Sequence, residues 1–219
     1  MCKQLLLIDL DGTLYNGNTF HVWIRFMLQH SFSLRNPLFR VLCFCRICYY
    51  SILRKTHRIS HSRFKFLIQH SWNLYFAYNE AFISAFIAKL KCNIREDLIE
   101  RIQKSSERGD AILLTTAAPE EYVKPLVESI NGIEDFLSTP KSTANIWFDN
   151  IRDEKCSQTV SFIEDRGLTN GTKILYTDHI DDEPLLKISN KAFLFEPLNK
   201  SISELKVCYP DIEIISFYG

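Results

Sequence analysis

The first fourteen residues constrain the fold more than any other stretch, because an apolar run there meets two acidic side chains. Leu5–Ile8 is uninterrupted and apolar, which predicts a buried strand of a parallel sheet. Asp9 and Asp11 follow it directly. Side chains at positions i and i+2 of an extended chain point to the same side, so both carboxylates can face one site. Open α/β sheets bind their ligands at this end of the strands.

Two close carboxylates repel each other unless a cation lies between them, and Mg²⁺ prefers such oxygen ligands. Asp9 and Asp11 therefore indicate a magnesium site. The alternative is a plain turn, in which the aspartate side chains only cap backbone groups.

Further apolar runs predict the rest of the sheet. They alternate with stretches of helical spacing, and this alternation favours an α/β fold with a parallel sheet. The expected strands cover residues 111–119, 135–139, 145–148, 173–177 and 191–195, and finally 212–217.

Charge is divided unevenly along the chain. The sequence is 46% hydrophobic and 24% charged, as in a soluble globular protein with a substantial core. Its 26 basic and 26 acidic residues cancel overall. The window from Gly12 to Asn79, however, contains no Asp or Glu, and it holds nine Lys or Arg and five of the six His. The remaining 17 basic and 26 acidic residues net −9, so we expect a separate basic region that attracts anionic substrates.

The cysteines indicate a reducing compartment. Their number, seven, is odd, and the start Met1-Cys2-Lys3-Gln4 does not resemble a signal peptide. We therefore expect free thiols and a cytoplasmic protein. The cluster of Cys43, Cys45 and Cys48 lies in an apolar helical stretch, which favours small buried side chains over metal ligands.

Helical spacing continues through the basic window and beyond it, over residues 19–28, 38–53, 60–76, 80–91 and 95–107. The second of these helices is expected to begin at Asn36-Pro37, with Pro at its first position, and it is almost wholly apolar apart from Arg40 and Arg46. Sixteen helical residues reach about 24 Å, short of a bilayer core of about 30 Å. Two interpretations stay open: a buried helix of an all-helical domain, or a helix lying in the membrane interface with its arginines among the headgroups.

Three further groups of polar residues stand where a phosphate could be bound. Thr116, or Thr115 beside it, ends an apolar strand just before a helix, where a hydroxyl can hold a phosphate oxygen or merely cap the helix. Lys155 lies in the first turn of a predicted helix, which is unfavourable for a cation unless it meets an anion. Asp178 and Asp182 follow the strand 173–177.

The order and spacing of these residues resemble the haloacid dehalogenase (HAD) superfamily of phosphotransferases. Asp9-Leu10-Asp11-Gly12-Thr13 matches its first motif, DxDGT, in full. Thr116-Ala117-Ala118-Pro119 resembles the second motif, with Thr115 as the fallback, and Lys155 falls where the third is expected. The segment from Thr177 to Pro184 resembles the fourth, GDSxxDxP, but it has Thr177 in place of Gly and His179 in place of Ser.

The resemblance implies a Rossmann-like core, residues 1–15 and 108–219, with an all-helical C1 cap inserted at residues 16–107. It also implies roles for the motif residues. Asp9 would be the nucleophile that forms an aspartyl-phosphate, and Asp11 the general acid and base. Phosphate would be bound by Thr116 or Thr115, by Gly12 and by Lys155. Mg²⁺ would be held by Asp9, the Asp11 carbonyl and Asp178, with Asp182 orienting either Lys155 or a metal-bound water.

The basic, aromatic cap resembles the subfamily that contains phosphatidylglycerophosphate phosphatases. We therefore expect a Mg²⁺-dependent phosphomonoester hydrolase whose substrate is anionic and partly apolar, such as a phospholipid headgroup phosphate. Peripheral contact of the cap with the inner membrane surface is part of this expectation. The alternatives are a soluble metabolite phosphatase similar to phosphoserine phosphatases, and a non-catalytic phosphoacceptor. Nucleic-acid binding is not expected, because the sequence has no recognised motif for it.

Overall fold

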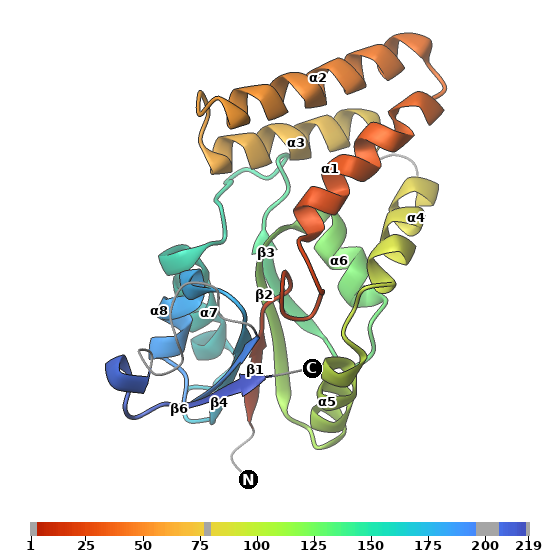
Figure 1. Ribbon diagram of the computed structural model, residues 1–219. Coiled ribbons are helices and arrows are strands. Elements are labelled where there is room, and N and C mark those ends of the chain that lie inside the picture. The colour runs from red at the N-terminus through yellow and green to blue at the C-terminus, as the bar shows by residue number, and fades with distance from the viewer. Residues whose placement is uncertain (1–3, 77–79, 196–205, 218–219) are drawn as a thin grey trace.

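A six-stranded sheet forms the base of the molecule in the computed structural model, which describes residues 4–76, 80–195 and 206–217 (Figure 1). The strand order is β3-β2-β1-β4-β5-β6, and all neighbouring strands are parallel. The predicted α/β fold is confirmed, and it places the first strand between β2 and β4. The strands are β1 Leu5–Ile8, β2 Ala111–Pro119, β3 Asp135–Thr139, β4 Lys173–Thr177, β5 Lys191–Phe195 and β6 Glu213–Phe217.

Helices cover both faces of the sheet, which explains why β1 is apolar without interruption. Successive side chains of a strand point to opposite faces. Leu6 and Ile8 join the apolar cluster under α5 (Glu96–Glu107) and α6 (Glu120–Glu128). Leu5 and Leu7 join the cluster under α7 (Arg152–Asp165) and α8 (Glu183–Lys187). All four side chains are at most 2% exposed.

Four helices form a cap beyond the carboxyl ends of the strands (Figure 1). Local signals set where three of them begin. Asn18 accepts a hydrogen bond from the His21 amide. Asn36, the residue before Pro37, accepts one from the Leu38 amide. Ser60 accepts from the Arg63 amide, so each helix has a side-chain cap at its N-terminus. The cap helices are α1 Thr19–His30, α2 Pro37–Lys55, α3 His61–Tyr75 and α4 Glu80–Lys91.

Aromatic side chains fix the cap to the sheet domain. The ring of Trp23 in α1 lies 5.2 Å from that of Trp72 in α3 and 5.0 Å from that of Tyr122 in α6. Phe86 in α4 lies 5.4 Å from Tyr122. These residues belong to the same apolar cluster as Leu6 and Ile8, so one core runs from the sheet into the cap.

One helix differs in length from the sequence-based expectation, and another lies at the predicted boundary of the cap. Helix α2 spans 19 residues; it begins at Pro37 as predicted and continues two residues beyond the predicted end at Leu53. Helix α5, which the predicted cap boundary includes, packs beside β2 of the sheet (Figure 1). In the part of the chain that the structure describes, no helix is long and apolar enough to span a bilayer.

The predicted strand at 145–148 is wrong. Residues 140–151 form an irregular segment that leaves the end of β3 and contacts cap helix α3. The Trp147 indole N–H donates to Gln69 Oε1 at 2.8 Å, and the Asn73 amide donates to Ser142 at 2.9 Å. The segment is thus held by polar contacts with the cap, in place of the hydrogen bonds that a strand would make with its neighbour in the sheet.

Candidate active site

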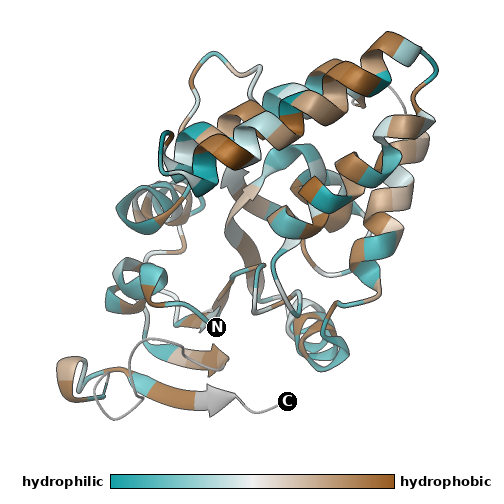
Figure 2. Ribbon diagram, turned by 45° about the horizontal axis from the view of Figure 1, so that its top comes forward, coloured by the Kyte–Doolittle hydropathy of each residue, from teal (hydrophilic) through white to brown (hydrophobic). Residues whose placement is uncertain are grey.

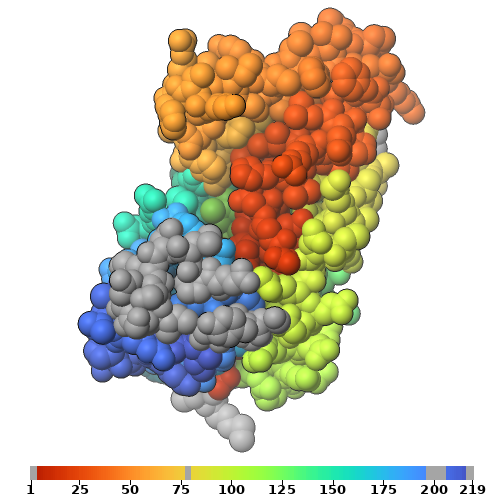
Figure 3. All heavy atoms as spheres, viewed as in Figure 1, coloured from red at the N-terminus to blue at the C-terminus, as the bar shows by residue number. Residues whose placement is uncertain are grey.

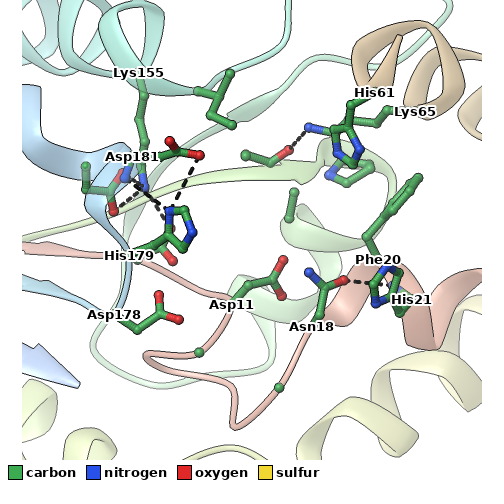
Figure 4. A pocket seen from close by; sticks show the side chains of 18 residues that line it. Asp11, Asn18, Phe20, His21, His61, Lys65, Lys155, Asp178, His179 and Asp181 are labelled. Carbon is green, nitrogen blue, oxygen red and sulfur yellow. Dashed lines mark hydrogen bonds and ion pairs between the residues drawn. The ribbon is translucent and has the colours of Figure 1, made fainter. Parts of the chain in front are cut away.

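A pocket of about 490 Å³ lies at the carboxyl end of β1, between the sheet and the cap (Figure 4). The sheet domain contributes the acidic side of this pocket and Lys155. The cap contributes aromatic and basic side chains. The residues used below that line it are Asp9, Asp11, Gly12, Lys155, Asp178 and Asp182 from the sheet domain, and Phe20, His21, His61 and Lys65 from the cap.

Lys155 is the centre of a buried ion-pair array. Its Nζ donates to Asp9 Oδ1 at 2.7 Å and to both Asp182 oxygens at 2.7 and 2.9 Å. The lysine is 3% exposed, and the two aspartates are 8% and 6% exposed. Burial alone would lower the pKa of Lys155, but Asp182 and Asp9 reverse the effect and hold it above its ordinary value. The two carboxylates therefore favour the charged form of Lys155 beside Asp9.

The two aspartates of the first motif are positioned by different elements. The Asp9 amide donates to the Tyr176 carbonyl of β4 at 3.0 Å, which holds Asp9 in the sheet. Asp11 lies beyond the strand, and its Oδ1 accepts a hydrogen bond of 2.6 Å from the Thr19 amide at the start of α1. Burial is the largest cause that raises the pKa of both groups, to about 8 for Asp9. In Figure 4 the Asp11 side chain extends into the same cavity as that of Asp178.

Gly12 allows Asp178 to approach the first motif closely. Its φ of +76° lies in the left-handed region, and a Cβ atom built on it would fall 1.8 Å from Asp178 Oδ2. No side chain other than glycine's hydrogen fits there. The pKa of Asp178 is raised to about 6, mainly by burial and also by Asp182 and Asp11.

The oxygen atoms in this corner suit a hard divalent cation. In the described residues, no three His, Cys, Asp or Glu side chains are grouped so that they alone could hold a metal ion. The predicted donor set differs from such a group, because it combines two carboxylates, Asp9 and Asp178, with the backbone carbonyl of Asp11. The buried acids also raise one another's pKa values, a repulsion that a cation would relieve. The residues present therefore fit Mg²⁺.

The two candidate threonines differ in their surroundings. The Thr115 hydroxyl lies 3.2 Å from that of Thr159 in α7, inside the sheet domain. The Thr116 hydroxyl accepts from the Ala118 amide at 3.1 Å, at the end of β2. Neither threonine lines the pocket; the residues of this segment that do are Ala117, Ala118 and Pro119, which follow them.

The two departures in the fourth motif have local functions. The Thr177 hydroxyl, where the motif has Gly, donates to Asp182 Oδ2 at 2.7 Å. The His179 ring, where the motif has Ser, accepts at Nδ1 from the Asp181 amide at 3.1 Å and caps the 3₁₀ turn Ile180–Asp182. Thr177 therefore adds a further hydrogen bond to the carboxylate that holds Lys155.

The cap contributes pocket residues that sequence reasoning did not assign to the site. Lys65 of α3 is 3% exposed, pairs with Asp149 and donates to the Ala117 carbonyl at 3.0 Å. His61, one turn earlier, also lines the pocket, and its pKa is lowered by burial and by Lys65. The one available signal was a lysine on the apolar side of a helix, next to Phe64.

Comparisons with known proteins identify the family and the fold. Residues 6–187 match the family model of haloacid dehalogenase-like hydrolases. No curated protein matches the chain significantly. Among solved structures, a Bordetella pertussis Tohama I protein of unknown function is 15% identical, with a TM-score of 0.75 and coverage of 98% of this chain and 99% of that one.

Two further solved structures show the same fold. A phosphoserine phosphohydrolase-like protein from Francisella tularensis subsp. tularensis SCHU S4 is 19% identical, with a TM-score of 0.53 and coverage of 97% and 94%. A predicted phosphatase from Clostridium acetobutylicum is 12% identical, with a TM-score of 0.56 and coverage of 98% and 94%. The family model covers most of the chain and the motif residues converge on one pocket, so the protein belongs to the haloacid dehalogenase-like hydrolases.

Proposed function

We propose that this hydrolase cleaves phosphomonoesters by way of an aspartyl-phosphate on Asp9, with Mg²⁺ as its cofactor. The observation that carries the proposal is the buried contact between Lys155 and Asp9, with Asp11 two residues further on in the same pocket. A nucleophile, an acid and a fixed cation within one cavity are the groups that phosphoryl transfer requires.

In the first step, a carboxylate oxygen of Asp9 attacks phosphorus while the bond from phosphorus to the ester oxygen breaks. Asp11, whose pKa is raised by burial, gives its proton to the departing alkoxide. Lys155 stabilises the charge that shifts onto the phosphoryl oxygens. The products of this step are the free alcohol and the acyl phosphate of Asp9.

In the second step, water attacks the phosphorus of the aspartyl-phosphate. Asp11, now a carboxylate, takes a proton from this water, and inorganic phosphate leaves as the Asp9 carboxylate is restored. Asp9, Asp178 and the Asp11 carbonyl would hold Mg²⁺, which when bound neutralises the facing negative charges. Asp182, paired with Lys155, keeps the lysine directed at Asp9.

Hydrolysis of p-nitrophenyl phosphate, with and without Mg²⁺, tests the reaction. We expect activity that chelation abolishes and that Mg²⁺ restores. Asp9→Asn removes the nucleophile, so it should reduce activity to background while the fold is kept. Equal turnover by this variant would disprove the catalytic assignment.

Asp11→Asn tests the covalent intermediate. The variant lacks both the acid of the first step and the base of the second, but p-nitrophenolate leaves without a proton. Phosphate from p-nitrophenyl phosphate should therefore reach the enzyme and stay on it, because no base activates water. Mass spectrometry should then find one phosphoryl group on the peptide that carries Asp9. A phosphoryl group on any other peptide, or on none, contradicts the two-step route.

For the substrate, we propose an anionic, partly apolar phosphomonoester, such as a phospholipid headgroup phosphate. Its support is the mixed lining of the pocket, where Phe20 lies beside His21, His61 and Lys65 (Figure 4). A small soluble phosphomonoester such as phosphoserine is the alternative. Initial rates on dihexanoyl phosphatidic acid and on phosphoserine separate them, and a preference for phosphoserine would refute the lipid-like substrate.

We also propose that the enzyme acts in the cytoplasm. Its support is the state of the cysteines, because the six in the described residues are all free thiols. Cell fractionation tests the assignment, and recovery from the periplasm or medium would contradict it.

A further inference from the structure

Helix α2 exposes an unusual amount of apolar surface. Its inner side packs on α3 through Cys43, Ile47 and Tyr50, which are at most 9% exposed. Its outer side is apolar as well, although it is the outermost helix of the cap (Figures 1 and 3). We call the following residues the α2 outer face: Phe32, Leu38, Phe39, Val41, Leu42, Phe44, Tyr49 and Ile52.

The exposed fractions show that this face is not covered by the cap. Leu38 is 62% exposed, and Val41, Tyr49 and Ile52 are each 58–59% exposed. Phe32, which precedes the helix, packs against Phe44 with tilted rings whose centres are 5.4 Å apart, and it extends the surface. Figure 2 shows apolar residues along the whole length of α2. Contiguous exposed apolar surface of this kind marks a docking site.

Cations flank the α2 outer face at both ends of the helix. Arg35 precedes the helix, Lys55 ends it and Arg58 follows it, and all three are exposed. Between residues 12 and 79 the sequence has no acidic side chain that could neutralise them. Arg40 and Arg46 within the helix turn their guanidinium groups aside, to the Leu34 carbonyl and the Tyr50 hydroxyl, and leave the apolar surface uninterrupted.

This combination selects one partner among the possible ones. A second copy of the chain would bring two equally basic caps together, with like charges around the contact. A bilayer of anionic phospholipids supplies both an apolar layer and negative headgroups. We propose that the α2 outer face docks on the surface of an anionic phospholipid bilayer, with the helix axis along the membrane plane.

The basic residues of α2 favour this orientation over a transmembrane one. Arg40, Arg46, Arg54 and Lys55 lie within its 19 residues, and each charge would be strongly unfavourable at the bilayer centre. Docking along the plane leaves these charges among the headgroups. The α2 outer face is also close to the pocket along the chain. Helix α2 ends at Lys55, and His61, the first residue of α3, lines the pocket. Membrane docking would bring the enzyme to the lipid-like substrate proposed above, and it can be measured without measuring turnover.

Vesicle flotation tests the docking directly. The full chain is mixed with vesicles of equal parts phosphatidylcholine and phosphatidylglycerol, or with vesicles of phosphatidylcholine alone. We expect the protein to float with the first and to stay at the bottom with the second. Equal flotation with both, or with neither, would overturn the proposal.

Two sets of variants locate the contact. Leu38→Gln, Val41→Gln and Ile52→Gln together should lower the partition coefficient on the order of a hundredfold, because they remove apolar area from the bilayer. Lys55→Gln with Arg58→Gln should lower it about thirtyfold, since each cation contributes about 1 kcal/mol at an anionic surface. The matched controls are Ile146→Gln and Val207→Gln, which change apolar side chains that are 78% and 81% exposed elsewhere. Binding lost equally in these controls would refute the assigned face.

A probe measurement covers the case in which the triple variant does not fold. Cys45 is exposed on α2, and Cys92 is exposed beyond α4. An environment-sensitive fluorophore on Cys45, with the other exposed cysteines replaced by serine, should shift to the blue on anionic vesicles. The same fluorophore on Cys92 should not shift.

Two further results would count against the proposal. A fluorophore shift on Cys92 alone would place the contact on another surface. A dimer in solution that the α2 substitutions abolish would identify a second copy as the occupant. Flotation should persist in Asp9→Asn, so failure of the docking and failure of the proposed catalysis are distinguishable.

Discussion

Lys155 joins two carboxylates that would otherwise repel each other inside the protein. It lies in the first turn of α7, where a cation interacts unfavourably with the helix dipole. Its ion pairs with Asp9 and Asp182 offset this unfavourable interaction. Breaking such a buried array by removing one partner is costly, because it leaves an uncompensated charge. The position of Lys155 therefore links the stability of the site to its chemistry.

Lys155→Gln should lower both stability and activity. We expect a loss of about 3–5 kcal/mol in the free energy of unfolding in Mg²⁺-free buffer, measured by urea denaturation. The value of kcat should fall about a hundredfold or more, because a charge that stabilises the transition state is lost. Adding Asp182→Asn to this variant removes one of the unpaired carboxylates, so stability should partly return while activity does not. Recovery of activity in the double variant would contradict the role of Lys155 in catalysis.

Gly12 and Gly109 offer a matched pair of substitutions. Their φ values are +76° and +77°, so alanine is strained by about 1–2 kcal/mol at either position. Only at Gly12 would the new Cβ collide with Asp178; at Gly109 it meets no heavy atom within 4 Å. Gly12→Ala should raise the Mg²⁺ concentration for half-maximal activity about tenfold or more, while Gly109→Ala should leave it unchanged. The same shift in both variants would mean that strain, and not the position of Asp178, sets metal affinity.

At the scale of elements, α3 and α6 meet through a buried carboxylate. Glu121 of α6 is 6% exposed and accepts from the Gln69 amide at 2.8 Å and the Asn73 amide at 3.2 Å, both on α3. The Ser142 amide donates to it at 3.3 Å. Glu121 thus connects the sheet domain, the cap and the irregular segment 140–151.

Because of Glu121, the stability of the protein should fall as pH rises. Burial raises its pKa above the ordinary 4.5, although its hydrogen bonds oppose the shift. The folded state therefore keeps this proton to a higher pH than the unfolded chain does. The stabilising contribution is present below the ordinary pKa and is lost as pH rises through the raised one.

Urea denaturation of wild type and Glu121→Gln between pH 4 and 8 measures this effect. The wild type should lose stability relative to the variant as pH increases, since glutamine carries no charge at any pH. Glu120→Gln, which removes a carboxylate from the same turn, is the matched control. A constant difference between wild type and Glu121→Gln would contradict the raised pKa.

The elements that the sequence predicts well are those defined by local patterns. The bounds of β2, β3 and β4 agree with their apolar runs, and Asn36-Pro37 correctly predicts the start of α2. The segment 145–148 also has apolar residues, but Trp147 bonds to Gln69, 78 positions earlier in the chain. A contact over that distance leaves no local pattern, and it decides the structure of the segment.

The same distinction applies to the site. Asp9, Asp11 and Asp178 could be predicted because each follows an apolar strand, and parallel strands bring their carboxyl ends together. Lys65 could not, because its partner Asp149 is 84 positions away and no regular element positions it. Residues at strand ends are thus predictable from sequence, whereas pocket residues of the inserted cap depend on how the cap docks.

At the scale of the whole molecule, the charge division of the sequence becomes a division in space. The basic, acid-free window forms α1 to α3 of the cap, and the net negative remainder contains the sheet. The pocket lies where the two meet, with Asp9 on one side and Lys65 on the other. An overall net charge of zero therefore conceals an excess of positive charge on the cap side, which we expect to steer anions toward the pocket.

Activity on a soluble aryl phosphate should accordingly depend on ionic strength. Raising KCl at constant Mg²⁺ should lower kcat/KM about fivefold, because salt screens the attraction between an anionic substrate and the cap. Arg54 acts electrostatically on His61 at the pocket, so Arg54→Gln should lower kcat/KM at low salt and weaken its salt dependence. Lys173→Gln removes the same charge at the amino end of β4, far from the strand ends that form the site, and should do neither. A salt dependence that both substitutions reduce equally would mean that net charge, and not the basic cap, attracts the substrate.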